Sequence, residues 1–274
     1  MSSSTSTRTG SHIARLFREV RQLGDTRACD LDALAVQDDL EICEFRCSSP
    51  GCAAMLVRID ETGGGIFLAP GPSRGGGRWR FSVAHEMGHY HIPWHRTAGL
   101  KYTCADADLR AREADAKRLE WEANDFAAEL LMPRQIFAGD ARGKDISFTT
   151  VGSLAGRDMY AVSVTSAAWR LVQTSRDACA LVVTCGGQVK WVARSKSFGL
   201  PLIERNQTVD PNSAVAATMR GEGSVASPRP VPWHAWFEPP THAGELLEST
   251  HAIPSANQVL ALLWFVEGDG SDDE

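Results

Sequence analysis

The sequence lacks any long apolar run. Its longest stretch, Val259–Val266, has the length of a strand, whereas a helix that spans a membrane needs about 20 apolar residues. The segment 1–11 is rich in serine and threonine and has no apolar centre, so we expect a disordered tail and not a signal peptide. These absences predict a cytoplasmic protein with no membrane partner.

A basic excess is also missing. The chain of 274 residues contains 28 lysines and arginines against 34 aspartates and glutamates, which gives a net charge of −6. A protein that binds nucleic acid normally carries a basic surplus or a basic stripe. We therefore expect no direct nucleic-acid binding.

The seven cysteines include no CxxC pair. An odd number of cysteines without an export signal indicates free thiols. Cys43, Cys47 and Cys52 fall within ten residues and could hold a structural metal. Because no fourth ligand follows closely, thiols in strands or in the core are the favoured interpretation.

The most informative segment present reads HEMGH and covers residues 85–89. On a helix, His85 and His89 lie about one turn apart on one face, so both imidazoles can bind one metal ion, and Glu86 lies beside them. The alternative is a surface helix with two solvated histidines. Apolar neighbours on both sides of the motif, and Pro93 at its end, favour a buried metal helix.

A catalytic zinc ion usually has three protein ligands and an open fourth position. The segment 118–133 predicts a long amphipathic helix that ends at Pro133. Glu120 and Asn124 share one face of this helix, so Glu120 is the favoured third ligand and Asn124 is a candidate to orient a ligand histidine. Glu122 points about 200° away from Glu120 and is the alternative ligand.

Two segments, 80–90 (RFSVAHEMGHY) and 120–133 (EWEANDFAAELLMP), together resemble the ImmA/IrrE family of bacterial metallo-endopeptidases. The resemblance implies a gluzincin-like site whose three zinc ligands and general base are, in that order, His85, His89, Glu120 and Glu86. Members of this family cut or inactivate helix-turn-helix repressors of stress responses and mobile elements. The chain shows no clear repressor-like domain of its own, so the implied partner is a separate repressor.

The residues of the motif predict metal-assisted amide hydrolysis. A zinc ion would polarise the scissile carbonyl and activate a water molecule, and Glu86 would move the proton of that water to the leaving amine. Manganese is an alternative ion, because imidazole and carboxylate ligands accept both. A further group must stabilise the oxyanion, and the sequence leaves four candidates open: Tyr90, His91, His95 and Tyr102.

The predicted fold class is α+β, beginning with a zincin-like domain over residues 12–135. Helices are expected at 12–23 and after Asp30, before the two motif helices. A small sheet is expected between the helix after Asp30 and the first motif helix, with strands at 41–47, 54–59 and 65–69. Residues 136–177 predict a short helical segment with helices at 151–155 and 163–171. It is helix-turn-helix-like, but its second helix offers one charge, so a packing or protein-docking role is favoured over DNA binding.

Residues 178–266 predict a C-terminal α+β domain, to which we assign a sensory or substrate-selecting role as a hypothesis. A hairpin is expected at 180–193 and a buried strand at 259–266. The aromatic group at 233–237 is either a recognition surface or a plug in the core. The acidic tail 267–274 is expected to be disordered.

Two functions are consistent with these features of the sequence. The first is a zinc endopeptidase that hydrolyses a peptide bond in a regulatory protein. The second is a metal-stabilised binding protein that inactivates a repressor by capture without cleavage. Ligation by histidine and glutamate with an open position favours the first, because structural zinc sites are usually closed and rich in thiolates.

Overall fold

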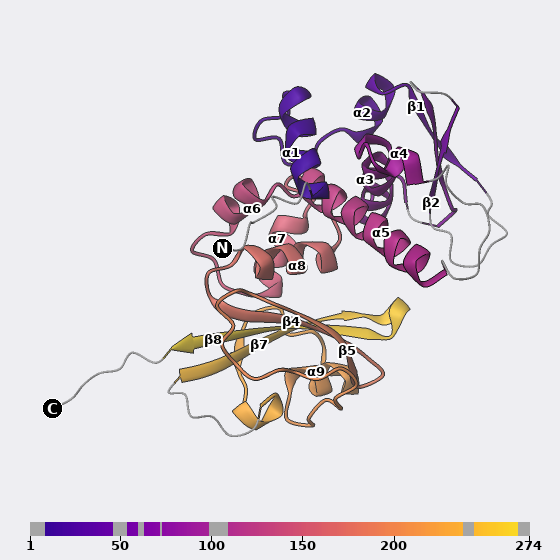
Figure 1. Ribbon diagram of the computed structural model, residues 1–274. Coiled ribbons are helices and arrows are strands. Elements are labelled where there is room, and N and C mark those ends of the chain that lie inside the picture. Colours follow the sequence, from indigo (N-terminus) through magenta and orange to yellow (C-terminus); the bar gives the residue numbers. More distant parts are fainter. Residues whose placement is uncertain are drawn as a thin grey trace, which may run out of the picture. The chain divides into compact units, whose positions relative to one another are not determined.

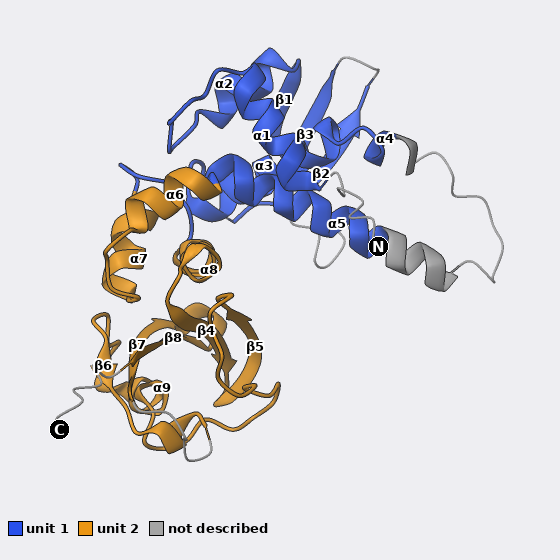
Figure 2. Ribbon diagram, turned by 60° about the vertical axis from the view of Figure 1, so that its left-hand side comes forward, with its two compact units in different colours: residues 1–133, 157–163 blue, residues 134–156, 164–274 orange. Residues whose placement is uncertain are grey.

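The computed structural model is mixed α+β with two separate sheets, which confirms the predicted fold class (Figure 1). It describes residues 9–45, 54–59, 63–71, 73–98, 109–237 and 244–267. Cys47, Cys52 and Tyr102 lie outside these residues, as do most of the two predicted tails. The chain divides into two compact units (Figure 2). Unit 1 comprises Met1–Pro133 and Arg157–Ser163, and unit 2 comprises Arg134–Gly156 and Val164–Glu274.

Unit 1 contains five helices among its described residues. They are α1 (Gly10–Val20), α2 (Leu31–Gln37), α3 (Gly77–His91), α4 (His95–Ala98) and α5 (Leu109–Leu131). The Asp30 carboxylate accepts a hydrogen bond from the backbone N–H of Ala33, which confirms Asp30 as the cap of α2. Helix α3 carries the HEMGH motif and α5 carries Glu120, as the sequence predicts.

The sheet of unit 1 has the order β1-β3-β2, with β1 at Leu40–Glu44, β2 at Ala54–Arg58 and β3 at Gly64–Leu68. Strand β1 runs parallel to β3, and β2 runs antiparallel to it. These strands lie within a few residues of the predicted ones. Both β2 and β3 pack on α3. Strand β2 is therefore an edge strand that lies next to the motif helix.

Helices α3 and α5 pack closely because their contact is lined by small residues. A Cβ atom added to Gly88 would lie 3.2 Å from both the Cα and the O atom of Ala123, and 3.2 Å from the Cβ atom of Phe126. Ala123 and Phe126 have no exposed surface. Gly88, inside the HEMGH motif, therefore sets the distance across which α5 presents Glu120 to the two histidines.

Replacing Gly88 with valine is expected to destabilise the metal-free protein by about 3 kcal/mol, because the added methyl groups overfill this contact. Urea denaturation of the purified variant measures the effect. The matched control is Gly139→Val on helix α6 (Arg134–Ala141), where a Cβ atom would meet nothing within 4 Å. We expect the control to change stability by less than about 1 kcal/mol. Equal effects of the two substitutions would contradict the close packing of α3 on α5 at Gly88.

Unit 2 combines three longer helices and one short helix with a five-stranded sheet of order β5-β4-β8-β7-β6. The helices are α6 (Arg134–Ala141), α7 (Phe148–Ala155), α8 (Val164–Thr174) and the short α9 (Ala214–Ala217). The strands are β4 (Ala178–Cys185), β5 (Gln188–Arg194), β6 (Arg229–Pro230), β7 (Gly244–Ile253) and β8 (Gln258–Glu267). The sheet is antiparallel throughout and curves around α9 (Figure 2). Gly186 and Gly187 join β4 to β5 with φ angles of 56° and 76°, as the predicted hairpin requires.

The expected helical segment 136–177 does not form a unit of its own. Helices α6, α7 and α8 belong to unit 2, where α8 packs on β4 and β5, and residues 157–163 belong to unit 1. The aromatic group at 233–237 contributes to the core of unit 2, because Trp236 is 4% exposed and Phe237 is 6% exposed. The structure thus favours the core-plug interpretation over a recognition surface.

Candidate metal centre

His85, His89 and Glu120 converge at the contact between α3 and α5. The Nε2 atoms of the two histidines lie 3.2 Å apart. One carboxylate oxygen of Glu120 lies 3.2 Å from Nε2 of His85, and the other lies 3.4 Å from Nε2 of His89. In the part of the chain that the structure describes, these three residues form the one group able to hold a metal ion.

The spacing of these atoms fits a tetrahedral metal ion. With metal–ligand bonds of about 2.0–2.2 Å, two ligand atoms of a tetrahedral zinc site lie about 3.3–3.5 Å apart. The observed separations of 3.2, 3.2 and 3.4 Å are close to this range. The three side chains therefore suit a zinc ion, and their imidazole and carboxylate donors also suit manganese.

Asn124 and Glu122, the other polar residues predicted near the site on α5, both contact histidines. The Oδ1 atom of Asn124 lies 3.0 Å from Nδ1 of His85. An amide oxygen can only accept, so Nδ1 of His85 donates and its Nε2 atom keeps a lone pair for a metal. Glu122 lies 2.9 Å from Nε2 of His95 and contacts neither His85 nor His89, so the structure does not bring it to the ligand cluster.

The protonation state of His89 suits a ligand. Burial lowers the pKa of His89 to about 3, and the neighbouring cationic forms of His85, His95 and Arg58 act in the same direction. Burial also lowers the pKa of His95 below its ordinary value, against the raising effect of Glu122. His89 is therefore neutral near pH 7, which is the state that binds a metal ion.

Glu86 lies beside the three ligands and is only 7% exposed. Burial raises the pKa of its carboxyl group to about 7, the nearby Glu120 carboxylate adds to the rise, and a backbone hydrogen bond from Leu56 opposes it. A carboxyl group with a pKa near the working pH can both take and return a proton. A metal cation next to Glu86 would favour its ionised form.

The raised pKa of Glu86 predicts that this residue lowers the free energy of unfolding of the metal-free protein as the pH rises. Between pH 4.5 and about 7 the folded state holds the Glu86 proton more tightly than the unfolded chain does, so stability falls as pH rises through this window. The glutamine of the Glu86→Gln variant stays neutral over this pH range. We expect the free energy of unfolding of the variant to equal that of the parent near pH 4 and to exceed it by about 3 kcal/mol at pH 8. Denaturant titrations with a chelator present measure the difference, and a pH-independent difference would contradict the proposed burial of Glu86.

Three of the four oxyanion candidates have their polar atoms engaged by other groups in the structure. The hydroxyl of Tyr90 donates to the backbone oxygen of Asp38 over 3.3 Å, and Nε2 of His91 lies 2.8 Å from the carboxylate of Asp38. Both ring nitrogens of His95 are also occupied, by His89 and Glu122. The fourth candidate lies outside the described residues. The oxyanion-stabilising group therefore stays open.

A cavity of about 440 Å³ lies in unit 2, and one of about 630 Å³ lies in unit 1. The larger of these two contains the candidate metal centre. The larger cavity is lined by the three candidate ligands, by Phe81, Ser82 and Glu86 of α3, by His95, and by four residues of β2. One of these is Arg58, which sequence reasoning missed. Its guanidinium donates to the backbone oxygens of His89 and Tyr90 over 2.8 Å each and lies over the ring of Tyr90. Arg58 thus holds the end of α3 against the edge strand.

One family of known proteins matches the part of the chain that contains these residues. Residues 58–157 match the IrrE N-terminal-like domain, Peptidase_M78. This match places residues 58–157 of the chain in the ImmA/IrrE family. The matched residues of this family domain include the three candidate ligands and Glu86. The chain therefore carries a domain of a peptidase family.

The fold of nearly the whole chain also resembles a solved structure. A Mycobacterium tuberculosis transcriptional regulator aligns with a TM-score of 0.55 over 94% of this chain and 87% of that one, at 12% sequence identity. At this identity the likeness concerns the fold alone. No curated protein matches the chain. In the described part of the chain, no helix has both the length and the apolar surface needed to cross a bilayer.

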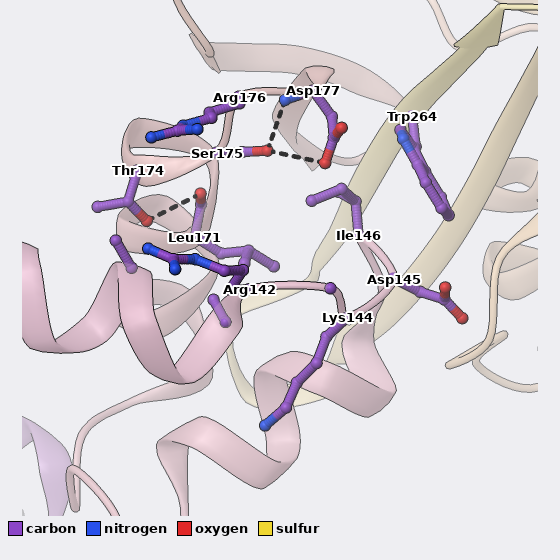
Figure 3. A pocket seen from close by; sticks show the side chains of 13 residues that line it. Arg142, Lys144, Asp145, Ile146, Leu171, Thr174, Ser175, Arg176, Asp177 and Trp264 are labelled. Carbon is purple, nitrogen blue, oxygen red and sulfur yellow. Dashed lines mark hydrogen bonds between the residues drawn. The ribbon is translucent and has the colours of Figure 1, made fainter.

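The smaller cavity lies in unit 2, among α6, α8, the loops that follow them and Trp264 of β8. Figure 3 shows the guanidinium groups of Arg142 and Arg176 on the same side as Thr174, while the Asp145 side chain points the other way. Arg142 directly follows the C-terminal end of α6, and Arg176 follows the C-terminal end of α8 by two residues. Cations at these positions complement the helix dipole. We therefore interpret these arginines as helix-end side chains. The sensory or substrate-selecting role of residues 178–266 stays a hypothesis.

Proposed function

We propose that this protein is a zinc-dependent endopeptidase that hydrolyses a peptide bond in a regulatory protein. The observation that carries the proposal is the position of Glu86, a buried carboxyl group that lines the same cavity as the converging His85, His89 and Glu120. A purely structural metal site has no need for such a group. The catalytic role of Glu86 is supported by its pKa near 7.

The residues of the cavity have distinct roles in this proposal. The three ligands would hold a zinc ion, which when bound supplies a Lewis acid for the scissile carbonyl. Glu86 would take a proton from the attacking water and give it to the leaving amine. Strand β2 is the edge of its sheet and lines the cavity, so an extended peptide could pair with it by backbone hydrogen bonds.

A regulatory protein as the substrate is supported by the family and by the fold shared with a transcriptional regulator. We infer that the substrate is a helix-turn-helix repressor of a stress response or mobile element, encoded as a separate polypeptide. We also infer a cytoplasmic site of action, because such repressors work there. The slight acidic excess of the chain argues against direct binding to nucleic acid.

Labelling of new protein N-termini in the native host tests the function. Cells that express the parent are compared with cells that express Glu86→Gln, with zinc supplied to both. We expect one or a few new N-termini in a repressor, present with the parent and absent with the variant. Loss of repression by both proteins without a new N-terminus would contradict cleavage and support the alternative function, capture of the repressor.

A further inference from the structure

We propose that His95 and Glu122 form a positioning relay that fixes the ring and the tautomer of His89, so that its Nε2 atom faces the metal. The inference rests on the proposed zinc site. It assigns a role to two residues of the motif region that the ligand set leaves unexplained. Neither residue contacts the metal position in this proposal, so both are positioning residues.

The contacts form a continuous chain from His89 to Trp94. The Nδ1 atoms of His89 and His95 lie 3.0 Å apart. The Nε2 atom of His95 lies 2.9 Å from Oε2 of Glu122, and the indole N–H of Trp94 donates to the same oxygen. The side chain of His95 is 2% exposed, so water has little access to replace any of these contacts.

The direction of each hydrogen bond follows from what each group can donate. The Glu122 carboxylate only accepts, so Nε2 of His95 carries a hydrogen. The two Nδ1 atoms lie close enough to share one hydrogen, and a His89 ring that binds the metal through Nε2 carries its own hydrogen on Nδ1. Nδ1 of His89 therefore donates, and Nδ1 of His95 accepts. The remaining nitrogen of His89, Nε2, is left with its lone pair directed at His85 and Glu120.

The relay gives the two ligand histidines equivalent supports. His85 donates from Nδ1 to the amide oxygen of Asn124, and His89 donates from Nδ1 to His95. Helix α5 supplies the metal ligand Glu120 and, two and four residues later, the orienting groups Glu122 and Asn124. One helix therefore fixes both histidines of α3 and completes the ligand set.

Loss of an orienting partner typically weakens metal binding by about 10- to 100-fold. Zinc affinity, measured by competition with a chromophoric chelator, is expected to fall by about this factor in His95→Leu and Glu122→Ala. Glu122→Gln keeps an oxygen that can accept from both His95 and Trp94, so we expect its affinity to stay within about threefold of the parent. The matched control on the same helix is Trp121→Ala, because the Trp121 side chain is 75% exposed and lies outside the relay.

Two further measurements separate positioning from general damage to the fold. The visible spectrum of the cobalt-loaded protein should change in His95→Leu and Glu122→Ala and stay unchanged in Glu122→Gln. Nitrogen-15 NMR of the histidines should show His89 protonated at Nδ1 in the parent. If His95→Leu fails to fold, as judged by circular dichroism, the comparison of Glu122→Ala with Glu122→Gln decides the question.

The outcomes distinguish the relay from the zinc site itself. Equal zinc affinities of the parent and the folded His95→Leu or Glu122→Ala variant would overturn the relay and leave the proposed function standing. Equal losses in Glu122→Ala and Glu122→Gln would also overturn it, because the acceptor oxygen would then have no role. A parent that binds no zinc would contradict the proposed function, and the relay with it.

Discussion

Glu86→Gln is expected to slow peptide cleavage by about 10²- to 10⁴-fold while the zinc content stays at the parent level. Glutamine has nearly the same shape but cannot accept the proton of the attacking water. Glu86 does not belong to the ligand triad, so its loss removes the base without removing a metal ligand. The rate is measured at a fixed zinc concentration, with the repressor found by N-terminus labelling as the substrate.

The control for this prediction is Glu19→Gln, which alters an exposed glutamate on α1. It should leave both rate and zinc content unchanged. The catalytic role of Glu86 would be wrong if the Glu86→Gln protein cleaved the repressor at the parent rate. A variant that still relieved repression without cleaving would instead favour the capture function.

Glu120→Ala is expected to weaken zinc binding by more than about 100-fold, since it removes one of three protein ligands and leaves two histidines. The Glu120 side chain is 59% exposed, so its truncation leaves no cavity in the core and should barely change the stability of the metal-free protein. Isothermal titration with zinc measures the affinity. His85 and His89 should remain in place, as judged by histidine NMR signals.

Glu19→Ala serves as the matched control, with an expected zinc affinity equal to that of the parent. Zinc binding that survived the loss of Glu120 would move the third ligand elsewhere on the chain. Glu122 is not available for that role without breaking its contacts with His95 and Trp94.

The ligand cluster could be predicted from local periodicity because it lies on two regular helices. The i, i+4 spacing of His85 and His89 and the shared face of Glu120 and Asn124 both follow from helix geometry. The order of the strands in unit 1 could not be predicted in this way. Pairing of β1 with β3 joins residues far apart in the sequence, and short strands carry little information about their partners.

Strand β7 and the role of His95 could not be predicted from the sequence either. The run Gly244–Ile253 contains polar residues at buried positions, such as Glu248 with no exposed surface, and so lacks the expected apolar pattern. Glu248 is buried because its carboxylate accepts hydrogen bonds from the first turn of α9 and from Trp236. His95 begins the short helix α4, four residues after the end of α3 at His91, and only the tertiary structure brings it to Glu122 on α5. Contacts between side chains of different elements give no periodic signal in the sequence.

The most direct test of the metal centre is the zinc content of the chain purified without chelator or nickel resin, determined by elemental analysis beside His85→Ala. We expect about one zinc ion per chain in the parent and almost none in the variant. A parent without bound metal, or a His85→Ala variant with an undiminished zinc content, would contradict the assignment of His85, His89 and Glu120 as the metal centre.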